Sequence, residues 1–137
     1  MVIQYNDCGY GSEYTAYFPV KAVSALPASG GDPIKSQFAI ASGYYAWTPA
    51  TADIRVIKDG GSPAALAGFS ASGTKNPASI EEGGTETGVW SITLTADEMS
   101  AECVVVVISD ATATPVIDDL CLILNTRSSR WVCVHNS

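Results

Sequence analysis

Segments in which hydrophobic and polar residues alternate recur along this chain, and each of them is short. The clearest covers residues 90–95, where Trp90, Ile92 and Leu94 alternate with Ser91, Thr93 and Thr95. Successive side chains of a β-strand point to opposite faces of the sheet. The pattern therefore predicts a strand with one buried and one solvated face.

A hairpin is predicted around residues 58–61. Ile54 and Val56 alternate with Arg55 just before the turn sequence Lys-Asp-Gly-Gly. Glycine accepts the positive φ that a tight hairpin turn requires. Residues 64–69 are therefore expected to supply the returning strand.

Further strands are predicted from runs of hydrophobic, β-branched and aromatic residues. Residues 14–23 read as an edge or bent strand, because Pro19 has no amide hydrogen to donate. Residues 103–108 are apolar on both faces, which is typical of a central strand. The remaining strands are expected at residues 34–40, around Ile80, at 116–124 and at 131–134.

These segments together predict an all-β fold, an immunoglobulin-like or jelly-roll sandwich of about seven or eight strands. Thr95-Ala96-Asp97-Glu98 has the form of a capping box, which predicts at most one short helical turn through Met99 and Ala101. Residues 14–137 are expected to form this single domain, and residues 1–13 an N-terminal arm.

Charge and hydropathy narrow the classes of partner. The 137 residues carry 14 acidic and 7 basic side chains, and the net charge of -7 repels nucleic-acid phosphates. The longest apolar run, residues 103–108, falls far below the roughly 18 residues of a membrane-spanning helix. No signal peptide is visible in the first residues. We expect no nucleic acid, no membrane insertion, and folding in a cytoplasm that keeps Cys8, Cys103, Cys121 and Cys133 reduced.

Candidate catalytic and metal-binding residues are few. His135 is the one histidine and lies near the C-terminus, where a catalytic base lacks rigid support. Adjacent carboxylates stand at residues 81–82, 97–98 and 118–119, but neighbours on a strand point to opposite faces. The cysteines lack zinc-site spacing, and no calcium-loop motif is present. The sequence predicts no catalytic, cofactor-binding or metal-binding residues, and a protein that is not an enzyme.

Three segments, in order, resemble a recurrent domain of tailed-phage tail, fibre and baseplate proteins. They are residues 46–50 (Ala-Trp-Thr-Pro-Ala), 53–61 (Asp-Ile-Arg-Val-Ile-Lys-Asp-Gly-Gly) and 90–99 (Trp-Ser-Ile-Thr-Leu-Thr-Ala-Asp-Glu-Met). The series spans about residues 17–125, most of the chain. The resemblance implies an immunoglobulin-like domain in a virion. Its motifs are structural, so it implies no particular site residue.

The resemblance also implies a function. It favours a non-enzymatic virion protein, made in the host cytoplasm, that assembles with other virion proteins, with a tail, fibre or baseplate component slightly preferred. A capsid decoration (cement) protein is an alternative, because the domain stands alone and not within a longer fibre chain. A carbohydrate-binding or adhesion module, which would hold a host surface glycan, is a second alternative.

Candidate interface residues come from the aromatic segments. Residues 14–23 form a poorly protected edge strand, which favours self-association into a trimer or ring. The aromatic group at residues 44–47 is a carbohydrate or partner platform, or else it covers one end of the core. Arms at either end of the chain would add contact area to so small a domain. The candidate interface residues are Tyr14, Tyr17, Phe18, Tyr44, Tyr45, Trp47 and Trp131.

Overall fold

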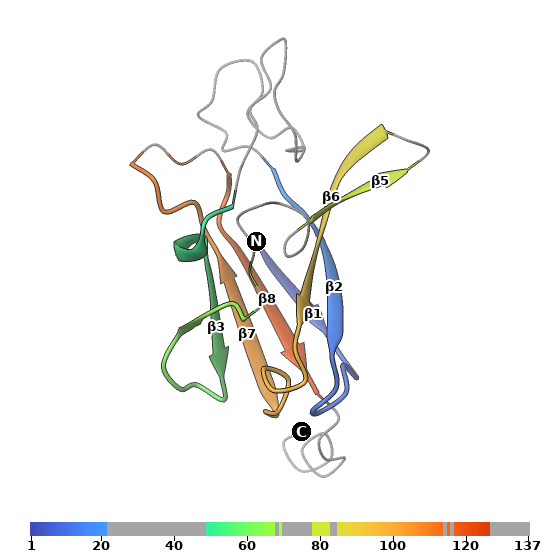
Figure 1. Cartoon of the computed structure of the whole chain (residues 1–137), viewed down its shortest axis with the longest axis vertical. Coiled ribbons are helices and arrows are strands. Elements are labelled where there is room, and N and C mark those ends of the chain that lie inside the picture. Colours follow the sequence, from blue (N-terminus) through green and yellow to red (C-terminus); the bar gives the residue numbers. More distant parts are fainter. Residues whose placement is uncertain are drawn as a thin grey trace.

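The computed structural model describes residues 1–21, 49–67, 69, 78–82, 85–113, 115 and 117–126, with the backbone alone at 78–82 and 85–88. Within these residues, eight strands form two sheets that pack as a sandwich (Figure 1). The strands are β1 (Val2–Tyr5), β2 (Tyr14–Pro19), β3 (Ile54–Lys58), β4 (Ala64–Ala65), β5 (Ala78–Glu82), β6 (Thr85–Leu94), β7 (Cys103–Ile108) and β8 (Leu120–Asn125). The predicted all-β sandwich is confirmed.

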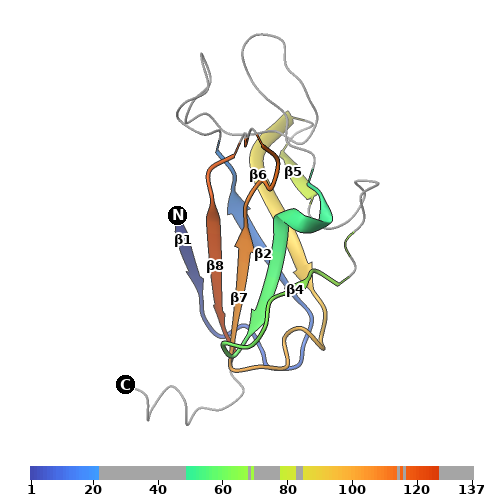
Figure 2. The ribbon, with the colours of Figure 1, turned by 90° about the vertical axis from the view of Figure 1, so that its left-hand side faces the viewer.

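The strand order of the two sheets can be matched, strand for strand, to that of an immunoglobulin domain. One sheet has the order β1-β8-β7-β3-β4 and the other β2-β6-β5 (Figure 2). Taken in chain order, β2 to β8 correspond to immunoglobulin strands B, C, C′, D, E, F and G, which gives sheets B-E-D and G-F-C-C′. β1 lies beside β8 and pairs with it in parallel.

The core lies between the sheets and is built from alternate side chains of β2, β3, β6, β7 and β8. On β6, Trp90, Ile92 and Leu94 are 1%, 0% and 0% exposed, while Ser91 and Thr93 are only partly buried. The alternation predicted for residues 90–95 is therefore confirmed. The inward-facing residues of β7 and β8 are Val104, Val106, Ile108, Leu120, Leu122 and Leu124.

Thr95 and Glu98 form the predicted capping box at the end of β6. The Thr95 amide donates to Glu98 Oε1 at 2.9 Å, and the Glu98 amide donates to Thr95 Oγ1 at 3.1 Å. One turn follows, in which the Met99 amide donates to the Thr95 carbonyl at 3.0 Å. A short 3-10 helix that the sequence did not predict, η1 (Thr51–Asp53), precedes β3.

The hairpin between β3 and β4 turns where the sequence predicted. Asp59 and Gly60 have φ values of 48° and 75°. The Gly61 amide donates to the Lys58 carbonyl at 2.9 Å. Two successive positive φ values are typical of a type I′ turn. The returning strand is shorter than the expected residues 64–69: β4 covers only Ala64–Ala65.

Replacing Gly60 by alanine is expected to lower the free energy of unfolding by about 1–2 kcal/mol, because an L side chain strains a positive φ. No atom lies within 4 Å of the added Cβ, so no clash contributes. Urea denaturation measures the change, and Ser62→Ala in the same exposed loop is the control. Equal stability of Gly60→Ala and the wild type would contradict the positive φ of Gly60 in this turn.

The first residues differ from the expected N-terminal arm of residues 1–13. β1 is one of the two edge strands of the five-stranded sheet, with Val2 in register with Cys121. Ile3 and Tyr5 pack against the core, and the Cys8 amide donates to the Asn125 carbonyl at 3.1 Å. This segment is therefore part of the sandwich. A four-residue strand has little pattern of its own, and its place depends on β8 at the other end of the chain.

Two other predicted strands, at residues 34–40 and 131–134, lie outside the described residues. The strand expected around Ile80 is β5, which pairs with β6. No helix in the described part of the chain has the length and apolar character to span a membrane.

Candidate interaction surface

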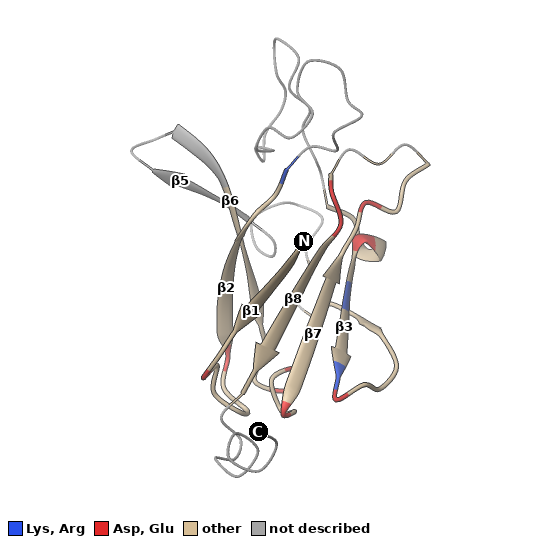
Figure 3. Ribbon diagram, turned by 180° about the vertical axis from the view of Figure 1, so that it is seen from behind, with Lys and Arg blue, Asp and Glu red and all other residues tan. Residues whose placement is uncertain are grey.

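The five-stranded sheet has one face on the core and one face away from it. We call the second the outer face, and no described element covers it (Figure 3). Its side chains occupy the positions that alternate with the buried ones on β1, β8, β7 and β3. They are Val2, Gln4, Arg55, Ile57, Cys103, Val105, Val107, Cys121, Ile123 and Asn125.

The strand registers place these side chains in rows across the outer face. Ile57, Val105 and Ile123 are direct neighbours on β3, β7 and β8. Val107 and Cys121 pair directly in the next row. Side chains opposite one another on adjacent strands lie about 4.5–5.5 Å apart at Cβ, so they form a continuous surface. The centre of the outer face is therefore apolar.

Polar and charged groups lie around this centre. Asp119 Oδ1 accepts from Ser109 Oγ at 2.7 Å at one end, and Asn125 donates to Asn6 Oδ1 at 3.1 Å at the other. Arg55 is exposed on β3. β1, β7 and β8 themselves contain no charged residue (Figure 3). An apolar centre within a polar rim is the usual arrangement of a protein–protein interface.

The outer face of the three-stranded sheet is different. Its exposed side of β6 carries Ser91 and Thr93, and Thr93 Oγ1 lies 2.9 Å from Thr15 Oγ1 of β2. Such hydroxyl groups are typical of a solvated sheet face. Threonine favours strands as valine and isoleucine do. Strand propensity alone therefore does not explain why the five-stranded sheet has aliphatic side chains on its outer face.

Two aspartates fix β3 to β7 at its two ends. Asp53 is buried, and its carboxylate accepts from the amides of Ala50 at 3.0 Å and Ala111 at 2.9 Å. Asp59 Oδ1 accepts from the amides of Glu102 at 3.1 Å and Cys103 at 3.0 Å. Both carboxylates connect segments far apart in sequence, so they hold the outer face in a fixed register.

Two cysteines belong to the outer face. The thiols of Cys103 and Cys121 are free and partly buried. Burial, and then the negative charges of Asp59 and Cys121, raise the pKa of the Cys103 thiol. Cys103 pairs with Asn125 and Cys121 with Val107. That offset of four residues separates the two cysteines by about 13 Å, too far for a disulfide.

All four thiols are expected to be reduced in the native protein. Cys8 is buried and free, and Cys133 lies outside the described residues. Intact mass measured without reductant, before and after alkylation in denaturant, checks this. A native mass about two hydrogens lower, with two thiols resistant to alkylation, would reveal a disulfide.

β2 is an edge strand, as predicted, but it is partly protected. The Tyr5 hydroxyl of β1 donates to the Tyr17 carbonyl of β2 at 2.5 Å, which bridges the two sheets at this side of the sandwich. Pro19 offers no amide hydrogen at the end of the strand. An occupied acceptor and a missing donor both disfavour the addition of another strand.

The predicted interface residues of β2 divide into two groups. Tyr17 is 56% exposed, and Tyr14 lies edge-on to Tyr5 with ring centroids 6.3 Å apart. Phe18 is only 1% exposed and packs in the core, so it is not available to a partner. Phe18 faces inward because successive side chains of β2 point alternately to the core and to solvent. A run of aromatic residues in the sequence does not show which of them takes the inward position. The other four, Tyr44, Tyr45, Trp47 and Trp131, lie outside the described residues.

Stability is expected to fall as the pH rises from about 10 to about 12, because of Tyr5. Burial, and then the charges of Tyr14 and Cys8, raise the pKa of Tyr5 from 10.0 to about 12. Between these values the unfolded chain releases a proton that the folded chain keeps, so unfolding becomes more favourable. Urea denaturation at several pH values should show a shallower decline for Tyr5→Phe. An equal decline for both proteins would refute the role of Tyr5.

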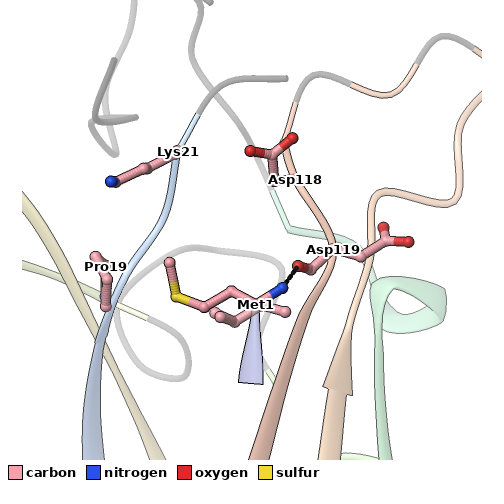
Figure 4. A pocket seen from close by; sticks show the side chains of 6 residues that line it. Met1, Pro19, Lys21, Asp118 and Asp119 are labelled. Atoms are coloured by element: carbon pink, nitrogen blue, oxygen red, sulfur yellow. Dashed lines mark hydrogen bonds between the residues drawn. The ribbon is translucent and has the colours of Figure 1, made fainter. Parts of the chain in front are cut away.

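A shallow cleft of about 290 Å³ lies between the end of β2 and the start of β8 (Figure 4). Lys21, Asp118 and Asp119 line it, and the Met1 amine donates to the Asp119 carbonyl at 3.2 Å. Figure 4 shows the Lys21 and Asp118 side chains pointing in different directions. These groups do not converge on one point, so the cleft offers no arrangement for proton transfer or metal binding.

A second cleft, of about 380 Å³, lies between the β3–β4 hairpin and the capping-box turn. Its polar groups already contact neighbouring segments. Lys58 Nζ donates to the Asp97 carbonyl at 2.8 Å, and Glu98 Oε2 accepts from the Ala67 amide at 2.8 Å. Alanines form much of the remaining wall. The polar groups of this cleft therefore hold the β3–β4 hairpin against the capping-box turn, and they are not free to bind a ligand.

The carboxylate pairs that the sequence raised are structural where they are described. Glu98 is held in the capping box, and Asp119 contacts Ser109 and points away from Asp118 (Figure 4). The side chains of Glu81 and Glu82, and His135, lie outside the described part. Among the described residues, no three His, Cys, Asp or Glu side chains gather where they could hold a metal ion.

The outer face was not identified from the sequence as a site. The apolar run of residues 103–108 was interpreted as a strand covered on both faces. The available clue was a second apolar run, on the neighbouring strand β8. Two adjacent strands that are apolar on both faces place apolar side chains on the face of the sheet that points away from the core. Comparisons with protein-family models, curated proteins and solved structures found no match.

Proposed function

We propose that this protein is a non-enzymatic structural component of a tailed-phage virion, with the tail, fibre or baseplate favoured, and that it acts through protein–protein contacts. The aliphatic outer face of the five-stranded sheet carries the proposal. An exposed apolar patch on a protein surface often marks a site where another molecule binds.

The sequence resemblance supports the same proposal. Its second and third segments contribute the β3 hairpin, strand β6 and the capping-box turn. These parts define the sandwich and contain no reactive group beyond those that hold it together. The resemblance therefore supports the proposal through the fold that these segments build, and the outer face supplies the contact surface.

Cys121 allows a direct test, because its thiol lies in the centre of the outer face. Phage particles would be purified and treated with iodoacetamide, and the labelled protein compared with the protein released from the particles. We expect the chain in the particles by mass spectrometry, and slower labelling of Cys121 there than in the released protein. Buried Cys8 should label slowly in both samples.

Two results would count against the proposal. If purified particles lack the chain, the virion role is lost. If Cys121 labels equally fast in particles and in released protein, the outer face is not a contact surface in the virion.

A further inference from the structure

The outer face is large enough for a weak interface and too small for a permanent one. Four strands of four to six residues, β1, β8, β7 and β3, with a rise near 3.3 Å per residue and a spacing near 4.8 Å, cover on the order of 330 Å². A stable complex buries about 800 Å² on each partner. Contact through this face alone therefore belongs to the weak, reversible class of interfaces.

The charges of Arg55 on β3 and of Asp59 in the turn that follows it are self-complementary about Ile57. Arg55 is exposed on one side of Ile57, and the exposed Asp59 lies on the other. A two-fold axis that crosses the strands at Ile57 would bring each Arg55 over the Asp59 of the second copy. Asp59 is held in place by the Glu102 and Cys103 amides, so its carboxylate is fixed for such a contact.

The same axis passes along an aliphatic row. Ile57, Val105 and Ile123 lie side by side on β3, β7 and β8. In a two-fold interface the residues on the axis meet their own copies, so each of these side chains would oppose an aliphatic partner. No acidic residue lies on β1, β7 or β8, so two chains of net charge -7 would meet on a neutral surface.

We propose that the outer face binds a second copy of this chain, as a weak two-fold dimer centred on the row of Ile57, Val105 and Ile123. The proposal rests on the proposed function, because it names the partner of the same surface. It also differs from the trimer or ring that the edge strand β2 suggested.

Sedimentation velocity over protein concentrations from about 10 μM to about 1 mM tests the proposal, in the range that matches a weak interface. Wild type should pass from monomer to dimer. Ile123→Lys should remain monomeric throughout, because it sets two ammonium groups against each other on the axis. Ser91→Lys, the matched substitution on the outer face of the three-stranded sheet, should dimerise as the wild type does.

Arg55→Glu tests the charge pairing, and it should raise the dimer dissociation constant roughly tenfold or more, since like charges oppose across the interface. Circular dichroism should show the wild-type fold for all three variants, because each side chain faces away from the core. Alkylation of Cys121 in the wild type should slow as the protein concentration rises.

Several results would overturn this inference: a monomer at every concentration, a trimer or ring, or an Ile123→Lys variant that dimerises normally. Cys121 protected equally at all concentrations would also overturn it, since the face would then be covered by another segment of the same chain. A monomer in solution whose Cys121 is protected in particles would refute the dimer and leave the proposed function standing. If the protein dimerises in solution but purified particles lack the chain, the dimer stands and the proposed virion function is refuted.

Discussion

Replacing Trp90 by alanine is expected to lower the free energy of unfolding by about 3–5 kcal/mol, the usual cost of removing a large aromatic side chain from a core. Trp90 is 1% exposed and lies on β6 directly opposite Phe18 of β2. Domains of this kind have a total stability of only about 5–15 kcal/mol, so the loss is a large part of it. Urea denaturation followed by circular dichroism measures the change.

Two further variants keep this prediction testable if the alanine variant fails to fold. Trp90→Phe retains most of the buried area and should cost less than Trp90→Ala while remaining folded. Tyr17→Ala removes a neighbouring aromatic side chain that is largely exposed, and it should cost under about 1 kcal/mol. Similar losses for Tyr17→Ala and Trp90→Ala would contradict the arrangement of the core.

Replacing Asp53 by asparagine is expected to cost about 2–3 kcal/mol, because two backbone amides donate to its buried carboxylate. The Ala50 amide donates to Oδ2 and the Ala111 amide to Oδ1. Asparagine has one acceptor oxygen, and its amide nitrogen would face a second donor. Equilibrium urea denaturation measures the loss.

Asp118→Asn is the matched control for Asp53, since it makes the same chemical change at an exposed position near the start of β8. We expect its stability to change by less than about 0.5 kcal/mol. Equal effects at the two positions would show that the change comes from net charge and not from the hydrogen bonds of Asp53.

Local patterns were read correctly where the information lies within about ten residues. The alternation of residues 90–95 identified the buried face of β6. The glycines at residues 60–61 marked the hairpin turn, and Thr95 with Glu98 marked the capping box. In each case neighbouring residues alone satisfy the geometry, so the tertiary structure had little left to decide.

The outer face and its partners could not be read in the same way. The aliphatic residues of β7 were correctly assigned to a central strand, but their second face was assumed to be covered. Phe18 was counted among the surface aromatics, although β2 turns it into the core. Whether an apolar side chain meets the core or solvent depends on which strands lie beside it, and that is a non-local property.

The sequence by itself determined that this chain is an all-β sandwich, where one of its hairpins turns, and which side of β6 is buried. The tertiary structure alone decided the strand order of the two sheets, the pairing of β1 with β8, and the contact of Asp53 with Ala111. The physical reason is the distance along the chain. Alternation and turn chemistry act between near neighbours, whereas sheet pairing and the burial of a carboxylate depend on segments that only folding brings together.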